Sequence, residues 1–102
     1  MTKASLALEA FIDETIYRSA EKSYYPTTFI GMRQRYGTIP AISKLVRSGD
    51  VQSGFRRLRQ LNLLDWTIEA AVLKFPDEFS QQDRECAAFR LREVGYGTSE
   101  VV

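Results

Sequence analysis

Apolar residues recur at helical spacing throughout this chain, and proline and glycine interrupt the pattern at short intervals. Apolar positions three or four residues apart lie on one side of a helix, whereas proline and glycine tend to end one. No segment alternates apolar and polar residues as a strand does, and the Asn-Gly and Asp-Gly pairs of tight hairpins do not occur. The sequence therefore predicts an all-α chain of five to six short helices.

Residues that cap or stop helices set the expected boundaries. Ser80, with Asp83 three positions later, resembles a capping box, and Gly37 and Gly95 supply left-handed stops. Residues 97–102 follow the last stop and are expected to form a flexible tail. The expected helices span about residues 5–20, 27–36, 38–47, 53–61, 66–75 and 80–94.

The length of 102 residues and a hydrophobic content of 44% fit one compact domain, residues 1–102. No apolar run is long enough to cross a membrane. Glu9, Asp13 and Glu14 interrupt the apolar N-terminal segment, which argues against a signal peptide. A single cysteine, Cys86, excludes an internal disulfide, so we expect a cytoplasmic protein.

The chain contains no histidine. Histidine is the commonest general base and the commonest metal ligand, so its absence argues against an enzyme and against a metal site. We expect no catalytic residue and no cofactor. Cys86 is expected to be a small core residue rather than a nucleophile.

Basic residues concentrate in the middle of the chain although the net charge is only +1. Residues 25–62 hold seven basic groups and one acidic group, whereas residues 63–102 hold four basic and eight acidic groups. This asymmetry indicates a surface for an anionic partner. The alternative is that the basic middle pairs with the acidic flanks. The candidate binding face comprises Arg33, Arg35, Lys44, Arg47, Arg56, Arg57 and Arg59.

A helix-turn-helix-like segment, residues 38–61, is one interpretation of the basic middle. Its second helix would place Arg56 and Arg57 near bases, with Arg59 or Lys44 near phosphates. The turn between the two expected helices is long for this motif. Nucleic-acid binding is therefore the alternative function and not the leading one.

The first helix carries an unusually wide apolar arc, because Leu6 and Tyr17 add a second stripe beside the main one. A wide arc predicts cover on two sides, either by the domain itself or by a partner. We therefore expect a protein partner or self-association through Leu8, Ile12 and Ile16. Tyr24 and Tyr25 form an aromatic corner after this helix and are candidate interaction residues. The alternative for this corner is simple packing.

Three charged residues fall on apolar faces and need partners. Glu9 and Asp13 lie in the arc of the first helix, and arginines of the middle segment are the expected partners. The alternative is an acidic functional site. Arg90 lies on the apolar side of the last helix, either in a buried ion pair or with its head group reaching solvent.

A scattered set of aromatic, apolar, glycine and proline positions from residue 24 onward carries a resemblance. The set comprises Tyr24, Tyr25, Pro26, Thr27, Phe29, Met32, Gly37, Leu45, Gly54, Phe55, Leu58, Leu64, Asp65, Ile68, Glu69, Val72, Leu73, Pro76, Phe79, Leu91, Gly95 and Tyr96. It is similar to small helical modules of uncharacterised prokaryotic proteins. The resemblance leaves residues 1–22 outside, and it implies no activity, cofactor or binding residue.

These observations favour a non-catalytic macromolecule-binding module. A protein partner ranks ahead of nucleic acid because it requires no special residue.

Overall fold

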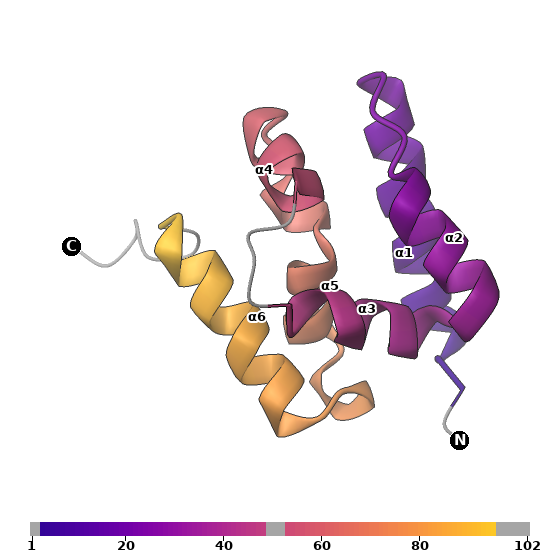
Figure 1. Ribbon diagram of the computed structural model, residues 1–102, viewed down its shortest axis with the longest axis vertical. Coiled ribbons are helices and arrows are strands. Elements are labelled where there is room, and N and C mark those ends of the chain that lie inside the picture. The colour runs from indigo at the N-terminus through magenta and orange to yellow at the C-terminus, as the bar shows by residue number, and fades with distance from the viewer. Residues whose placement is uncertain (1–2, 49–52, 96–102) are drawn as a thin grey trace.

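Residues 3–48 and 53–95 are described by the computed structural model, and they form an all-α single domain (Figure 1). Within these ranges there is no strand. Short 3₁₀ turns at Leu64–Trp66 and Pro76–Glu78 precede the last two helices. The predicted tail 97–102, and residues 49–52 of the predicted turn, lie outside the described residues. The helices are α1 Leu6–Glu21, α2 Thr27–Tyr36, α3 Thr38–Val46, α4 Ser53–Gln60, α5 Ile68–Lys74 and α6 Gln81–Glu93.

Side-chain caps and left-handed glycines fix most of these ends. The hydroxyls of Ser5, Thr67 and Ser80 accept hydrogen bonds from backbone N–H groups three residues on, at 3.0–3.1 Å. Gly37 and Gly95 have φ values of +95° and +78°, in the left-handed region that favours glycine. The local sequence therefore accounts for the beginnings of α1, α5 and α6 and for the ends of α2 and α6.

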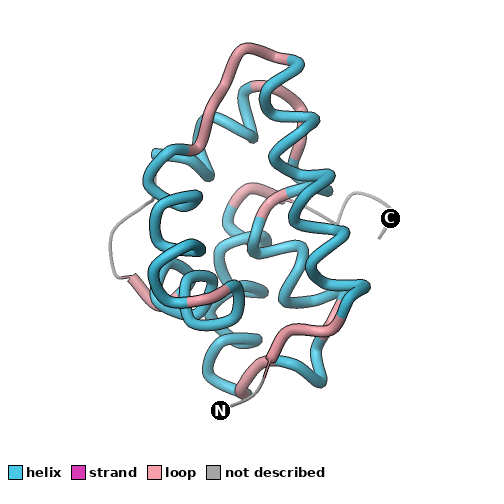
Figure 2. The backbone as a smooth tube through the Cα atoms, turned by 90° about the vertical axis from the view of Figure 1, so that its right-hand side faces the viewer, coloured by secondary structure: helices cyan, strands magenta, loops and turns pink. Residues whose placement is uncertain are grey.

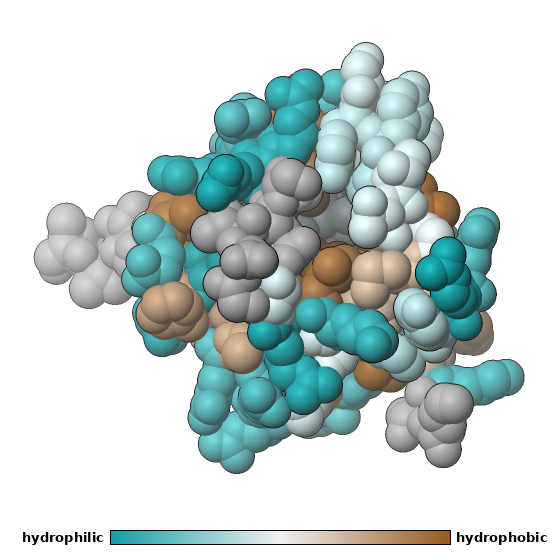
Figure 3. All heavy atoms as spheres, viewed as in Figure 1, coloured by the Kyte–Doolittle hydropathy of each residue, from teal (hydrophilic) through white to brown (hydrophobic). Residues whose placement is uncertain are grey.

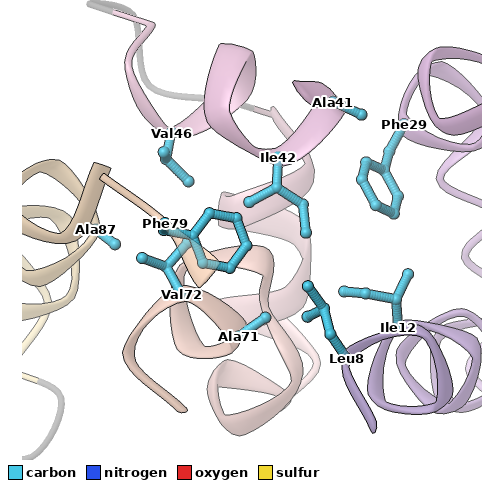
Figure 4. Packing of buried hydrophobic residues seen from close by; sticks show 10 residues of the cluster. All are labelled: Leu8, Ile12, Phe29, Ala41, Ile42, Val46, Ala71, Val72, Phe79 and Ala87. Atoms are coloured by element: carbon cyan, nitrogen blue, oxygen red, sulfur yellow. The ribbon is translucent and has the colours of Figure 1, made fainter. Parts of the chain in front are cut away.

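The core lies where α1, α2, α3, α5 and α6 meet (Figure 4). Ile42 and Val46 of α3 point toward Val72 of α5, while Leu8 and Ile12 of α1 approach from the other side. Burying a branched aliphatic side chain of this kind stabilises the fold by about 1.5–3 kcal/mol. The buried cluster comprises Leu8, Ile12, Phe29, Ala41, Ile42, Val46, Ala71, Val72, Phe79 and Ala87.

The packing of α1 corrects the predicted partner surface at Leu8, Ile12 and Ile16. Leu8 and Ile12 have no exposed surface, and Ile16 packs partly buried against the same core. Leu8 and Ile12 therefore stabilise the chain itself and leave no surface for a partner, and Ile16 leaves only part of its side chain accessible. The second stripe is not covered by the domain itself, since Leu6 and Tyr17 are 88% and 59% exposed, and its cover by a partner stays a prediction.

Phe11 makes the second apolar contact of α1 instead. Its ring stacks on Trp66 with 4.8 Å between centroids, and it meets Phe75 edge-on at 5.8 Å. Arg18 lies on α1, two turns after Phe11, and its guanidinium is 4.4 Å from the centre of the Trp66 ring. The 3₁₀ turn before α5 is thereby held against α1.

Short loops join the helices, as the view in Figure 2 shows. In Figure 1, α1 and α2 stand at one side of the molecule, α6 lies at the other, and α4 rises between them. In the part of the chain that the structure describes, no helix is both long and apolar enough to cross a membrane.

Candidate binding cleft beside a basic helix

A cleft of about 360 Å³ lies between α4 and the corner that joins α1 to α2. Figure 3 shows a hollow between these two parts of the surface, in the same view as Figure 1. We call this cavity the α4 cleft. It is lined by Thr15, Ser19, Tyr24, Tyr25, Pro26, Thr27, Thr28, Phe29, Leu45, Gly54, Phe55, Leu58, Ile68 and Glu69.

Apolar side chains from four helices form the walls of the α4 cleft. Phe55 and Leu58 come from α4 and are only 6% and 7% exposed. They stand three residues apart, so the helical period places both on one face of α4. Phe29 of α2, Leu45 of α3 and Ile68 of α5 complete the walls.

Tyr24 and Gly54 meet at one edge of the cleft. The Tyr24 hydroxyl oxygen lies 2.9 Å from the position that a Cβ atom would take on Gly54, so a larger residue there would require the tyrosine side chain to shift. Burial raises the pKa of Tyr24, and the positive charge of Arg57 lowers it in part. The positive charge of Arg57 therefore reaches the edge of the cleft where Tyr24 and Gly54 meet. Tyr25 is 62% exposed at the rim, so the predicted aromatic corner divides into one packed ring and one exposed ring.

One residue that lines the cleft, Glu69, belongs to a buried ion pair. Glu69 of α5 is 1% exposed, and its Oε2 accepts a hydrogen bond from Arg90 Nη1 of α6 at 2.6 Å. Burial raises the pKa of Glu69, although the charge and hydrogen bond of Arg90 oppose that rise. Of the two alternatives for Arg90, the structure therefore adopts the buried ion pair. Sequence reasoning did not assign Glu69 as its partner.

Two further buried polar residues, Thr15 and Ser19, line the cleft. Thr15 is 4% exposed, and its hydroxyl has no hydrogen-bond partner among the described residues. Ser19, one turn later, differs because its hydroxyl donates to the Thr15 carbonyl at 2.8 Å. Sequence reasoning missed Thr15. The available signal was its place on the buried stripe of α1, which continues from Leu8 and Ile12.

The predicted basic face is divided by the acidic flanks. Arg33 pairs with Glu9 at 2.6 Å and with Asp13 at 2.9 Å, so its charge belongs to the link between α1 and α2. Arg47 pairs with Asp83 at 3.2 Å. The alternative interpretation, in which basic residues pair with acidic ones, holds for these two arginines, and they are removed from the candidate face.

Three arginines of α4 have a different environment. Arg56, Arg57 and Arg59 are exposed, and among the described residues none of them forms an ion pair with a carboxylate. Within the described residues, the side-chain hydrogen bond of Arg57 is to Gln60, at 3.5 Å. We call these three residues the α4 arginines. The remaining candidates, Arg35 and Lys44, are exposed, and their charged groups lie 5.8 Å and 5.3 Å from the centre of the Tyr36 ring.

Glu9 belongs to a structural network and not to an acidic site. Its Oε1 accepts hydrogen bonds from the Arg33 guanidinium and from the Thr38 hydroxyl, each at 2.6 Å. Burial alone would raise the pKa of Glu9, but these two hydrogen bonds and the Arg33 charge together lower it. The network joins α1 to the start of α3.

Within residues 3–48 and 53–95, no group of three His, Cys, Asp or Glu side chains lies close enough together to hold a metal ion. Cys86 is half-buried on α6.

The fold and the site together define a small all-α domain with an apolar cleft beside an arginine-rich helix. Comparisons with protein-family models, curated proteins and solved structures found no match. The resemblance to prokaryotic helical modules therefore stays a prediction.

Proposed function

We propose that this chain is a non-catalytic protein-binding module that holds an acidic, apolar segment of a partner at the α4 cleft. The observation that carries this proposal is the position of the apolar cleft directly beside the α4 arginines. An interface of this kind needs an apolar pocket for an anchoring side chain and a charged rim that orients the partner.

The size and lining of the cleft support an anchoring role. About 360 Å³ lies within the range of ordinary ligand pockets. The walls are phenylalanine, leucine and isoleucine, which release water readily when an apolar group enters. Tyr25 is exposed at the rim, where an aromatic ring adds contact area at low entropic cost.

The charge of α4 supports an acidic partner. Each α4 arginine projects from the helix that forms one wall of the cleft, and the charge of Arg57 acts on Tyr24 at its edge. Rim charges mainly accelerate association and select against partners of the same sign. We therefore expect carboxylates on either side of the anchoring residue. The proposed setting is the cytoplasm, on the ground of the single cysteine.

Nucleic-acid binding is the second candidate, because exposed arginines without carboxylate partners also suit phosphates. Arg35 and Lys44 beside Tyr36 would extend such a surface. The helix-turn-helix-like interpretation of residues 38–61 stays a prediction, since residues 49–52 of its turn are outside the described part of the chain. An apolar cleft is of no use to phosphate binding, and so protein binding ranks first.

Display selection from a random peptide library tests the proposal. We expect the selected peptides to combine acidic residues with an aromatic or large apolar residue. Their affinity should fall about tenfold when Arg56, Arg57 and Arg59 are replaced by alanine. It should also fall for Thr28→Trp, which fills the mouth of the cleft from an exposed position.

A charge-matched variant serves as the control. Replacing Lys3, Lys74 and Arg92, which are exposed and do not line the cleft, removes the same charge and should leave the affinity within about twofold. Equal losses in the two triple variants would contradict a local site. Mixed-sequence duplex or single-stranded nucleic acid should bind weakly. Tight binding that weakens steeply with salt, in the absence of enriched peptides, would favour the nucleic-acid alternative.

A further inference from the structure

We propose that two copies of this chain form an antiparallel dimer through the outer face of α1. The outer face is the line of this helix that points away from the core, and it carries Leu6, Ala10 and Tyr17. It lies on the other side of α1 from Thr15 and Ser19, which line the α4 cleft. The dimer is therefore independent of the proposed peptide-binding function and goes beyond it.

The outer face is apolar where a surface helix is ordinarily polar. The buried stripe of α1 consists of Leu8, Ile12, Thr15 and Ser19. At 3.6 residues per turn, Ala10 and Tyr17 project almost directly away from this stripe, and Leu6 projects within about 30° of the same direction. Ala10 is exposed, and Leu6 and Tyr17 are 88% and 59% exposed. An apolar line on the solvent side of a helix indicates a surface that a second molecule covers.

The charged side chains that flank this line are already neutralised. Asp13 lies on one side of it and pairs with Arg33 at 2.9 Å. Glu14 lies on the other side and pairs with Arg18 at 2.8 Å. A second copy therefore meets carboxylates that keep their own counter-ions, and no unpaired charge is buried at the middle of α1.

The two ends of the outer face decide which partner fits, because they carry opposite charges. Lys3 precedes α1 and Glu21 is its last residue, and both are exposed. Among the described residues, neither forms an ion pair. An antiparallel copy brings Lys3 of each chain to Glu21 of the other and forms the same pair twice, as a two-fold axis requires. A parallel copy would bring like charges together.

The apolar residues match in the same alignment. Leu6 and Tyr17 are 11 residues apart, which is about 16 Å along the helix axis. When Leu6 of each copy lies against Tyr17 of the other, the two alanines at position 10 flank the two-fold axis. Their small side chains allow the helices to approach closely. Apolar contacts and charge pairs therefore select the same register.

The area of contact sets the strength of the dimer. The 16 residues of α1 extend about 24 Å, and one pair of such helices buries less than the roughly 800 Å² per partner of a stable interface. We therefore expect a dissociation constant on the order of 10⁻⁴ M. The dimer leaves the α4 cleft of each copy open, because Thr15 and Ser19 line that cleft from the other side of α1.

Sedimentation equilibrium of the full chain between about 10 µM and about 1 mM tests the proposal. Wild type should be mostly monomeric at the low end and mostly dimeric at the high end. Leu6→Gln and Tyr17→Gln should each weaken the dimer about tenfold, since each change is present twice at the interface. Phe89→Gln on α6 removes a ring that is 58% exposed and should stay within about twofold of wild type. A wild type that stays monomeric at about 1 mM, or an equal loss in Phe89→Gln, would overturn the proposal.

Charge exchange tests the register. Lys3→Glu and Glu21→Lys each place like charges at both ends of the dimer and should weaken it about fivefold. The double variant restores opposite charges in the antiparallel alignment and should return to within about twofold of wild type. Both positions are exposed, so circular dichroism should show unchanged helix content. Single variants that dimerise as well as wild type, or a double variant as weak as the single ones, would rule out the antiparallel dimer.

Discussion

Arg90 of α6 donates a hydrogen bond to Glu69 of α5 across 2.6 Å, and the same guanidinium reaches the end of α3. There it donates to the Ser48 carbonyl at 2.9 Å and approaches the carbonyls of Leu45 and Val46 at 3.3–3.4 Å. One side chain therefore joins three helices directly beneath the candidate site. The guanidinium thereby donates to carbonyl groups at and just after the C-terminal end of α3.

Replacing Arg90 by methionine should lower the free energy of unfolding by about 3–5 kcal/mol at neutral pH. The change keeps an apolar stem of similar length but leaves the Glu69 carboxylate buried without its counter-ion. Denaturant unfolding followed by circular dichroism measures the loss. Arg92→Met, on the exposed side of the same helix, is the control and should stay within about 0.5 kcal/mol of wild type.

The loss of unfolding free energy caused by Arg90→Met should also depend on pH, and we call this loss the deficit. Burial raises the folded-state pKa of Glu69, and loss of Arg90 removes the interactions that oppose this rise. A carboxyl group with a raised pKa stabilises the fold below its unfolded-state pKa, and the stabilisation is lost as the pH rises through the folded-state value. The deficit relative to Arg92→Met should therefore be smaller at about pH 5 than at about pH 8. A deficit that does not vary with pH would contradict this account.

Glu9 should make the fold less stable in acid, which is the opposite pH dependence to that expected for Glu69. Its pKa is lowered in the folded state, so its contribution is present above the unfolded-state pKa and is lost as the pH falls through the folded-state value. Glu9→Gln should be less stable than wild type at neutral pH, and the difference should shrink in acid. Unfolding free energies of the two proteins over a pH series provide the measurement. Glu21→Gln, at an exposed position on α1, should show no comparable trend.

Gly54 and Tyr24 should be energetically coupled. Alanine at position 54 gains up to about 1 kcal/mol of helix propensity, but its Cβ would lie 2.9 Å from the Tyr24 hydroxyl oxygen. Gly54→Ala should therefore be neutral or destabilising in wild type. In a Tyr24→Phe background, which lacks that oxygen, the same change should be stabilising. Unfolding of the four proteins gives the coupling energy, and purely additive effects would show that the contact imposes no constraint.

Two glycines near α2 should respond in opposite directions to alanine. Gly31 lies inside α2, and a Cβ there meets no atom within 4 Å, so Gly31→Ala should stabilise by about 0.5–1 kcal/mol. Gly37 has a φ of +95°, and Gly37→Ala should destabilise by about 1 kcal/mol or more. Thermal unfolding of both variants checks the pair. A stabilising change at position 37 would contradict the left-handed ending of α2.

Most helix boundaries could be predicted because they depend on neighbouring residues. A serine or threonine hydroxyl reaches the N–H group three residues on whatever the rest of the chain does, as at Ser5, Thr67 and Ser80. A left-handed glycine likewise ends a helix locally, as at Gly37. The all-α class follows from these signals and from the helical spacing of apolar residues.

The exposed faces of α1 could not be assigned in the same way. Leu6 and Tyr17 are as apolar as many core residues, yet they are exposed, whereas Phe11 was left out of the expected arc and stacks on Trp66. Periodicity shows which residues share a side of a helix. It does not show which side a neighbouring helix covers, because that depends on how the helices cross.

Local patterns are sufficient to predict the helices, most of their ends, and that Glu9, Asp13 and Arg90 need partners. The identity of two partners depends on the folded chain: Arg33 pairs with Glu9, 24 residues away, and Arg90 pairs with Glu69, 21 residues away. The tertiary structure also decided that the α4 arginines keep no carboxylate partner among the described residues and that Thr15 lines a cleft. The physical reason is range. Caps and turns act over three or four residues, whereas ion pairs and cavities depend on where whole helices lie after the core has packed.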